Sequence, residues 1–197
     1  DPYAKEFAYM QYGAWDRLDD NRPFLAGYEA KPAPCHYYPQ DITEEEFNAL
    51  NDANKDSWYT VLRRDENGNL IVKWYHEEYA EEVGRMCELL QKAADLAEDA
   101  GLKNYLLKRI DAFRTDDYLA SDLAWMDMKD CNMDLVIGPI ENYDDHLFEA
   151  KAAYECFILL KDEKRSANLA KYVGLLPTLQ TMLPCAPEYK TFVPGTS

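Results

Sequence analysis

The sequence lacks any apolar run that approaches the roughly 18 residues a membrane-spanning helix needs. It is also poor in basic side chains: 21 Lys and Arg stand against 37 Asp and Glu, a formal net charge of −16. Nucleic acids and anionic lipids bind to cationic surfaces. The composition therefore predicts no nucleic-acid partner and no membrane partner. It favours a soluble protein with a neutral or cationic partner, and it leaves the compartment open between cytoplasm and periplasm.

A complete catalytic or metal-binding motif is also lacking. There is no G-x-S-x-G, no phosphate-binding glycine loop and no dinucleotide fingerprint. The five cysteines are odd in number and no two lie closer than 25 residues, which excludes a C-x-x-C site and argues against a disulfide scaffold. His76-Glu77-Glu78 resembles the start of H-E-x-x-H, but Ala80 stands at the fifth position. We expect no metal site in this chain and interpret His76 as a solvated residue at a helix start.

The sequence does contain ample material for a core. Hydrophobic residues make up 47% of its 197 residues, and aromatic residues 13%. This length predicts one domain or lobe, 1–197, with an aromatic-rich N-terminal segment, 1–35, packed on it. The chain begins at Asp1 rather than at Met, which we interpret as the mark of a segment from a longer polypeptide.

Local signals near the N-terminus predict two helices with a loop between them. The spacing of the aromatic residues favours a helix over about 3–18, and three prolines predict a loop over 31–39. Thr43 and Glu46 have the spacing of a capping box, in which each side chain accepts a hydrogen bond from the other residue's amide. The second helix should run from there to about Asn51.

A β-hairpin is expected next. The runs Trp58–Arg63 and Leu70–Tyr75 are rich in aliphatic and aromatic residues typical of strands. Asn67 and Gly68 lie between them, and glycine accepts the positive φ that a tight hairpin turn requires.

After the hairpin the hydrophobic period becomes helical. A stripe of apolar residues at steps of three and four marks a first helix, which Gly101 should break. A second stripe marks another helix. A third helix is expected over 117–129, with Leu119, Leu123 and Met126 facing inward.

The last third of the chain predicts two strands and a divided helix. Leu135–Ile140 and Ala152–Leu160 are apolar runs of strand length, and the second should be buried on both faces. A helical pattern covers about 163–183, and Pro177 should kink or divide it. The order of elements predicts an α+β fold, mostly helical, with a β-hairpin and further strands that form a small sheet or a partial barrel.

Two features are candidates for function. The polar segment Glu141–His146 directly follows an apolar strand, where binding residues often lie. An ordinary acidic turn at the surface would have the same sequence pattern. Glu155 is a charge inside the apolar run Ala152–Leu160, and a buried carboxylate needs a partner or a function. The alternative is that Glu155 faces solvent from an edge strand.

At Ile140-Glu141-Asn142-Tyr143 the sequence resembles the dipeptidyl peptidase III family of zinc metallopeptidases, whose members carry a similar Ile-Glu-x-Tyr segment after a strand. The resemblance covers about 36–185. Its further segments are Tyr38–Thr43, Thr115–Tyr118, Trp125–Asp130 and Lys151–Glu155.

The resemblance implies roles for four residues. Tyr143 matches the tyrosine that stabilises the transition state opposite the zinc. Glu141 and Asn142 match the substrate-binding loop. Glu155, after a one-residue adjustment, matches a glutamate that helps to hold the free amino terminus of the peptide, and a carboxylate suits an ammonium group.

The resemblance also implies a cofactor and partners. In that family zinc is held by H-E-x-x-H, or a variant one residue longer, and a distant glutamate, and this chain lacks those motifs. The intact enzyme would be two-lobed, would bind zinc and would remove dipeptides from the N-termini of short peptides. This chain would be its substrate-binding lobe, would meet the zinc-bearing lobe of the same polypeptide, would bind no zinc and would be inactive alone.

Two alternatives stay open at this point. A non-catalytic peptide-binding or interaction module would keep the same scaffold. A structural helical domain without a site would leave Tyr143 and Glu155 far apart or facing plain solvent, whereas the enzyme places both along one concave wall.

Overall fold

A computed structural model describes the chain over three ranges: residues 1–31, 36–129 and 131–190. The chain forms two compact units. Unit 1 comprises Asp1–Lys73 and Glu141–Ala153, and unit 2 comprises Trp74–Ile140 and the residues from Tyr154 onward. Unit 1 is therefore assembled from two stretches of sequence that a long excursion separates. The expectation of one lobe with 1–35 packed on it stays a prediction.

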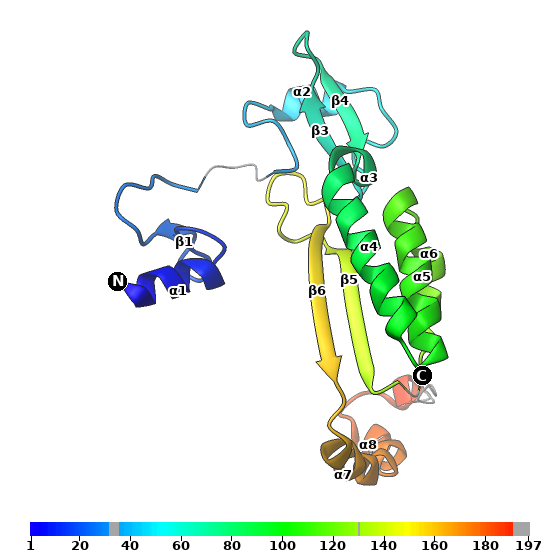
Figure 1. The fold of residues 1–197 in the computed structure, drawn as a ribbon. Coiled ribbons are helices and arrows are strands. Elements are labelled where there is room, and N and C mark those ends of the chain that lie inside the picture. The colour runs from blue at the N-terminus through cyan, green and yellow to red at the C-terminus, as the bar shows by residue number, and fades with distance from the viewer. Residues whose placement is uncertain (32–35, 130, 191–197) are drawn as a thin grey trace. The chain divides into compact units, whose positions relative to one another are not determined.

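The elements of the first 74 residues are α1 Pro2–Met10, β1 Trp15–Asp16, β2 Arg22–Pro23, α2 Glu44–Ala49, β3 Thr60–Arg64 and β4 Leu70–Trp74 (Figure 1). The first predicted helix, 3–18, is too long. Helix α1 ends at Met10 because Tyr12 and Gly13 take positive φ angles of 57° and 152°, and the Gly13 amide turns back to the Ala8 carbonyl at 2.9 Å. Residues 32–35 of the predicted loop lie outside the described residues.

The capping box and the hairpin are confirmed. The Glu46 amide donates to Thr43 Oγ1 at 3.1 Å, and the Thr43 amide donates to Glu46 Oε2 at 3.3 Å, so α2 begins where its sequence indicates. Strands β3 and β4 pair as a two-stranded sheet. Gly68 has φ 85° and donates its amide to the Asp65 carbonyl at 3.0 Å, the tight turn that its position predicts.

The core of unit 1 joins its two stretches of sequence. Tyr38, Phe47 and Leu62 are buried together. Phe148, from the second stretch, stacks on Phe47 with ring centroids 3.9 Å apart and an interplanar angle of 14°. It also meets Tyr38 edge-on at 5.1 Å. Aromatic packing of this kind fixes the second stretch on the first.

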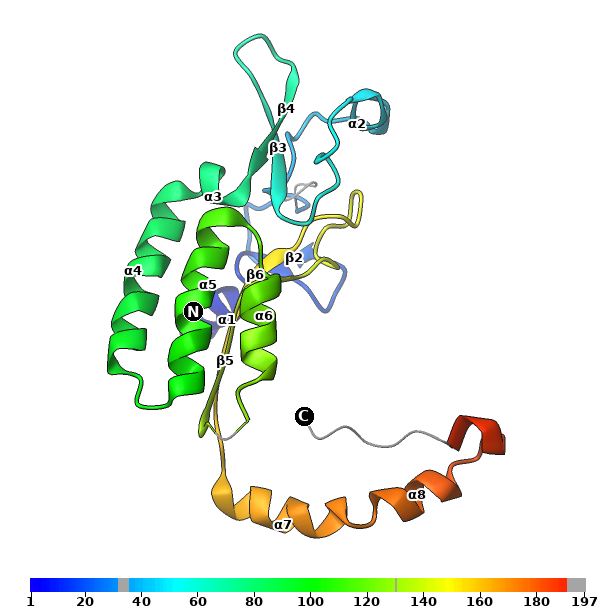
Figure 2. The same cartoon turned by 90° about the vertical axis from the view of Figure 1, so that its right-hand side faces the viewer.

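The elements of the rest of the chain are α3 Tyr75–Glu78, α4 Ala80–Leu96, α5 Ala100–Thr115, α6 Leu119–Met126, β5 Met133–Glu141, β6 Ala153–Leu160, α7 Glu163–Val173, α8 Leu176–Met182 and a 3₁₀ turn, Pro187–Lys190. Figure 2 shows α4, α5 and α6 side by side. Strands β5 and β6 form a two-stranded sheet.

The core of unit 2 lies between α5 and β6. Tyr75, Tyr105 and Phe113 are almost completely buried. Tyr154 of β6 stacks on Phe113 with a centroid distance of 6.1 Å and lies 5.5 Å from the Tyr75 ring. The α+β class is confirmed: helices dominate, and the strands form three two-stranded sheets in the described part of the chain.

Two burial predictions were wrong. Leu119, Leu123 and Met126 of α6 are 67%, 53% and 56% exposed, whereas Ser121 and Ala124 are buried. Small side chains let α6 approach α5 closely, so the packed face of α6 is its small face rather than its apolar one.

Strand β6 was expected to be buried on both faces, yet Phe157, Ile158, Leu159 and Leu160 are 54–75% exposed. The sheet has two strands over the described residues, so it buries little of either face.

The breaks between helices are only partly where the sequence places them. Helix α4 ends at Leu96, and Gly101 lies inside the first turn of α5, for which Asp99 is the N-cap. Pro177 divides the last helical segment as predicted, because it occupies the first turn of α8, where the missing amide costs nothing.

Candidate functional site

Three of the four predicted site residues lie in one segment of unit 1. Glu141 ends β5, and Asn142 and Tyr143 follow at once in the loop of residues 142–152, here called the Tyr143 loop. Tyr143 is 63% exposed, and Glu141 and Asn142 are half-buried. The loop therefore presents a phenol ring to solvent beside a carboxylate and an amide.

Asp145 organises the Tyr143 loop from inside. Its side chain is 2% exposed, and both of its oxygens accept hydrogen bonds. Oδ1 accepts from the amides of Leu147 at 3.1 Å and Phe148 at 3.3 Å. Oδ2 accepts from the amides of Ala150 at 2.9 Å and Lys151 at 3.0 Å, and from a side chain, the Tyr38 hydroxyl, at 2.5 Å.

These bonds decide the charge state of Asp145. Burial alone would raise its pKa, but the Tyr38 hydroxyl and the amides of Ala150, Lys151 and Leu147 together lower the pKa below its ordinary value of 3.8. Asp145 is therefore an ionised carboxylate at neutral pH, in a cradle of donors.

Lys151 fastens the far end of the loop to the first stretch of unit 1. Its side chain is fully buried, and its ammonium donates to the carbonyls of Lys55 at 2.7 Å and Ser57 at 2.9 Å and to Thr60 Oγ1 at 2.7 Å. Burial lowers the pKa of Lys151 to about 8, against the attraction of Asp145 and Asp56. Three acceptors match the three protons of the charged form.

Asn142 connects the start of the Tyr143 loop to its later residues. Its Nδ2 donates to the Glu149 carbonyl at 2.9 Å, and its own carbonyl accepts from the Asp145 amide at 3.1 Å. The side chain thus shapes the loop, and its amide oxygen still offers an acceptor beside Tyr143.

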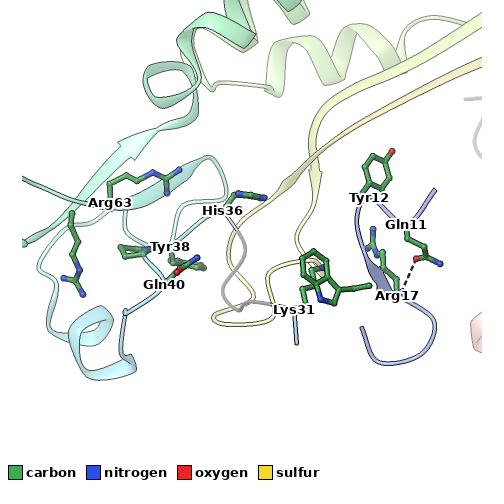
Figure 3. A pocket seen from close by; sticks show the side chains of 11 residues that line it. Gln11, Tyr12, Arg17, Lys31, His36, Tyr38, Gln40 and Arg63 are labelled. Carbon is green, nitrogen blue, oxygen red and sulfur yellow. Dashed lines mark hydrogen bonds between the residues drawn. The ribbon is translucent and has the colours of Figure 1, made fainter. Parts of the chain in front are cut away.

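The N-terminal segment contacts the same loop through an ion pair. Arg17 Nη2 lies 2.6 Å from Asp144 Oδ1, with side chains 45% and 33% exposed. Arg17 also lines a cavity of about 770 Å³ within unit 1 (Figure 3). Other parts of its wall come from Tyr38, Arg63 and Lys31. The wall combines aromatic rings with cations, and the Arg17 charge is already matched by Asp144.

Glu155 and His76 belong to unit 2. Glu155 is half-buried on β6. His76 is not simply a solvated residue, because its Nδ1 lies 2.8 Å from Oδ2 of Asp116, whose side chain is fully buried. Burial raises the pKa of Asp116, and the hydrogen bonds from His76 oppose that rise. Asp116 Oδ1 is buried without a hydrogen-bond partner.

No group of three or more His, Cys, Asp or Glu side chains among the described residues could hold a metal ion. Over the same residues, no helix has the length and apolar character to cross a membrane.

Sequence reasoning gave no role to Asp145, Lys151 or Tyr38, although Asp145 lies in the polar segment Glu141–His146 and the other two lie in segments that resemble the family. All three are buried polar residues whose partners lie far away in sequence: 107 residues separate Tyr38 from Asp145. Nothing local in the sequence marks these residues as buried and hydrogen-bonded, although a lysine next to an apolar strand is a weak signal of a paired, buried charge.

Comparisons with known proteins give this geometry its context. The model of peptidase family M49 matches residues 56–193. That range is well over half of the chain and includes the whole Tyr143 loop. The chain belongs to peptidase family M49, the dipeptidyl peptidase III family.

Solved structures of the M49 family agree. The chain superposes on the structure of DPP III from Caldithrix abyssi with a TM-score of 0.85 and 41% identity, over 97% of this chain and 37% of that one. It matches dipeptidyl-peptidase III from Corallococcus sp. strain EGB with a TM-score of 0.73 and 36% identity, over 89% of this chain and 34% of that one.

A curated relative is a longer protein as well. Nudix hydrolase 3 of Arabidopsis thaliana is 30% identical over 231 aligned positions, which cover 90% of this chain and 30% of that protein. The M49 chain described here thus spans about a third of the length of each of these relatives. M49 is a family of zinc metallopeptidases, so the chain is related to peptidases.

Proposed function

We propose that this chain is the substrate-binding portion of a zinc-dependent dipeptidyl peptidase that removes dipeptides from the N-termini of short peptides. The observation that carries the proposal is the Tyr143 loop: an exposed tyrosine, preceded by Glu141 and Asn142, within the range that the M49 family model matches. When bound by the full-length polypeptide, the metal would supply Lewis-acid chemistry for activating water and polarising the scissile carbonyl. The steps assigned to the residues of this chain are binding, orientation and hydrogen bonding.

Tyr143 acts on the reacting carbonyl. Its hydroxyl donates a hydrogen bond to the oxygen of the scissile peptide as negative charge develops there. Tyr143 is 63% exposed, so a peptide that lies along the loop can reach this residue. A donor of this kind is stronger towards the transition state than towards the substrate, so it raises kcat rather than affinity.

Glu141, Asn142 and Glu155 position the substrate. The two carboxylates attract the α-ammonium group of the peptide, and the Asn142 amide oxygen accepts from the peptide backbone. The net charge of −16 draws a cationic end towards the chain. Recognition of a free amino terminus two residues before the scissile bond limits cleavage to a dipeptide.

The test is product analysis with the full-length polypeptide. Short peptides with a free amino terminus are incubated with it, and the products are identified by mass spectrometry. Dipeptides from the N-terminus are expected, and the matched N-acetylated peptides should stay intact. Binding without cleavage would show a non-catalytic peptide-binding module instead, and release of single residues would contradict recognition at dipeptide distance.

A further inference from the structure

We propose that Asp145 is the positioning residue that fixes where the Tyr143 hydroxyl lies. The inference rests on the proposed function, because it concerns how Tyr143 is placed for its task. Asp145 lies two residues beyond Tyr143, and its carboxylate is covered by the loop that it organises.

The two oxygens of Asp145 divide the loop between them. Oδ1 gathers the amides of Leu147 and Phe148, and Oδ2 gathers those of Ala150 and Lys151. The Asp145 side chain thus accepts amide hydrogen bonds within residues 147–151 that a helical turn would satisfy with backbone carbonyls. A charged acceptor makes each of these bonds stronger than a neutral one would.

The same carboxylate ties the loop to the body of unit 1. Oδ2 also accepts from the Tyr38 hydroxyl, and Tyr38 is a core residue with 4% exposure. In the same loop, Phe148 stacks on Phe47, and the Lys151 ammonium donates to the Thr60 hydroxyl. Core residues of unit 1 therefore form a rigid base for the loop, and the Asp145 carboxylate is hydrogen-bonded both to this base and to the loop amides.

Tyr143 depends on this base for its position. The Asp145 amide donates to the Asn142 carbonyl at 3.1 Å, so Asp145 closes the turn that carries Tyr143. A shift of about 1 Å in a reacting group can cost on the order of a hundredfold in rate. Loss of the Asp145 template should therefore appear in kcat before it appears in substrate binding.

Asp144 supplies the matched control. It is the neighbouring residue and carries the same charge, but its partner is Arg17 in an ion pair with side chains 45% and 33% exposed. Such pairs contribute little. A change at Asp144 alters the charge of the loop without touching its template.

The experiment is a double-mutant cycle in the full-length polypeptide, read as kcat and KM for a short peptide. Asp145→Asn should lower kcat by about tenfold or more with KM within about threefold, and Asp144→Asn should change kcat by less than about threefold. In a Tyr143→Phe background, Asp145→Asn should lower kcat by less than about threefold, because the group that it positions is gone.

Every outcome decides the matter. Equal loss of kcat in both backgrounds would overturn the positioning role and leave Tyr143 as proposed. No loss from Tyr143→Phe alone would instead overturn the proposed function at that residue. Should Asp145→Asn fail to fold, Tyr38→Phe replaces it in the same double-mutant cycle, because this substitution removes one hydroxyl and keeps the ring. An equal loss of kcat from Tyr38→Phe with and without Tyr143→Phe would again count against the proposal.

Discussion

The Lys151 ammonium and the Thr60 hydroxyl are joined by a hydrogen bond of 2.7 Å, although 91 residues separate them in sequence. Both side chains are fully buried. With the carbonyls of Lys55 and Ser57, Thr60 completes a cage of three acceptors around a cation. The bond ties the two stretches of unit 1 together at the end of the Tyr143 loop.

Lys151→Met should destabilise the chain by about 2–4 kcal/mol. The substitution keeps the length of the side chain, but it leaves the buried Thr60 hydroxyl and two partly buried carbonyls without their donor, and each loses a charge-assisted bond. The measurement is urea denaturation at neutral pH. Lys164→Met, on the exposed face of α7, is the control and should stay within about 0.5 kcal/mol. Equal effects of the two substitutions would show that the cage contributes nothing specific.

The stability that Asp145 supplies should depend on pH. Its pKa is lowered in the folded chain, so its contribution is complete above the ordinary value of 3.8 and is lost as the pH falls through the lower folded pKa. The deficit of Asp145→Asn relative to the parent should be largest near about pH 7 and should shrink below about pH 4. Denaturant midpoints of both proteins at several pH values measure it, and a deficit that grows towards acid would contradict the sign.

Gly68→Val should destabilise the hairpin by on the order of 1 kcal/mol or more. Gly68 has φ 85°, which a β-branched residue tolerates poorly, while nothing lies within 4 Å of its missing Cβ. The cost is therefore conformational and not steric. Gly84 of α4 also has open space but no positive φ. Gly84→Ala should raise the free energy of unfolding by about 0.5–1 kcal/mol. The opposite signs at the two positions would show that the cost at Gly68 comes from its positive φ and not from the loss of a glycine.

The features that the sequence predicts are those whose cause is local. The Thr43 capping box, the turn at Gly68 and the division at Pro177 each depend on residues within a few positions, and all three are confirmed. The buried face of α6 and the exposure of β6 depend on which elements pack alongside. The α6 prediction failed because Ser121 and Ala124, and not the leucines, are the buried residues of α6.

The site divides in the same way. The block around Tyr143 could be found from its residue types and their order. Its support could not, because Asp145 reaches Tyr38 across 107 residues and Lys151 reaches Thr60 across 91. Polar residues of this kind look like surface residues until the fold brings their partners to them.

Glu155→Gln in the full-length polypeptide should raise KM by about tenfold or more and change kcat little. The carboxylate is proposed to meet the substrate ammonium, an interaction present equally in the ground and transition states. Loss of one charge-assisted bond corresponds to about 1.5–3 kcal/mol. Glu163→Gln, at the exposed start of α7, is the matched control and should leave both constants unchanged. An unchanged KM for Glu155→Gln would remove this residue from the substrate site.

Tyr143→Phe should lower kcat by roughly a hundredfold or more in the full-length polypeptide, as loss of an oxyanion donor typically does. KM should change little, because the neutral carbonyl of the substrate gains less from the same hydrogen bond. Zinc content and melting temperature should stay near those of the parent, since the ring is kept and Tyr143 is not a proposed metal ligand. Tyr172→Phe, which alters a tyrosine 62% exposed on α7, is the control and should have no effect. If kcat of Tyr143→Phe stays within about threefold while zinc is retained, the hydroxyl has no part in the reaction, and the residue assignment fails where its support is strongest.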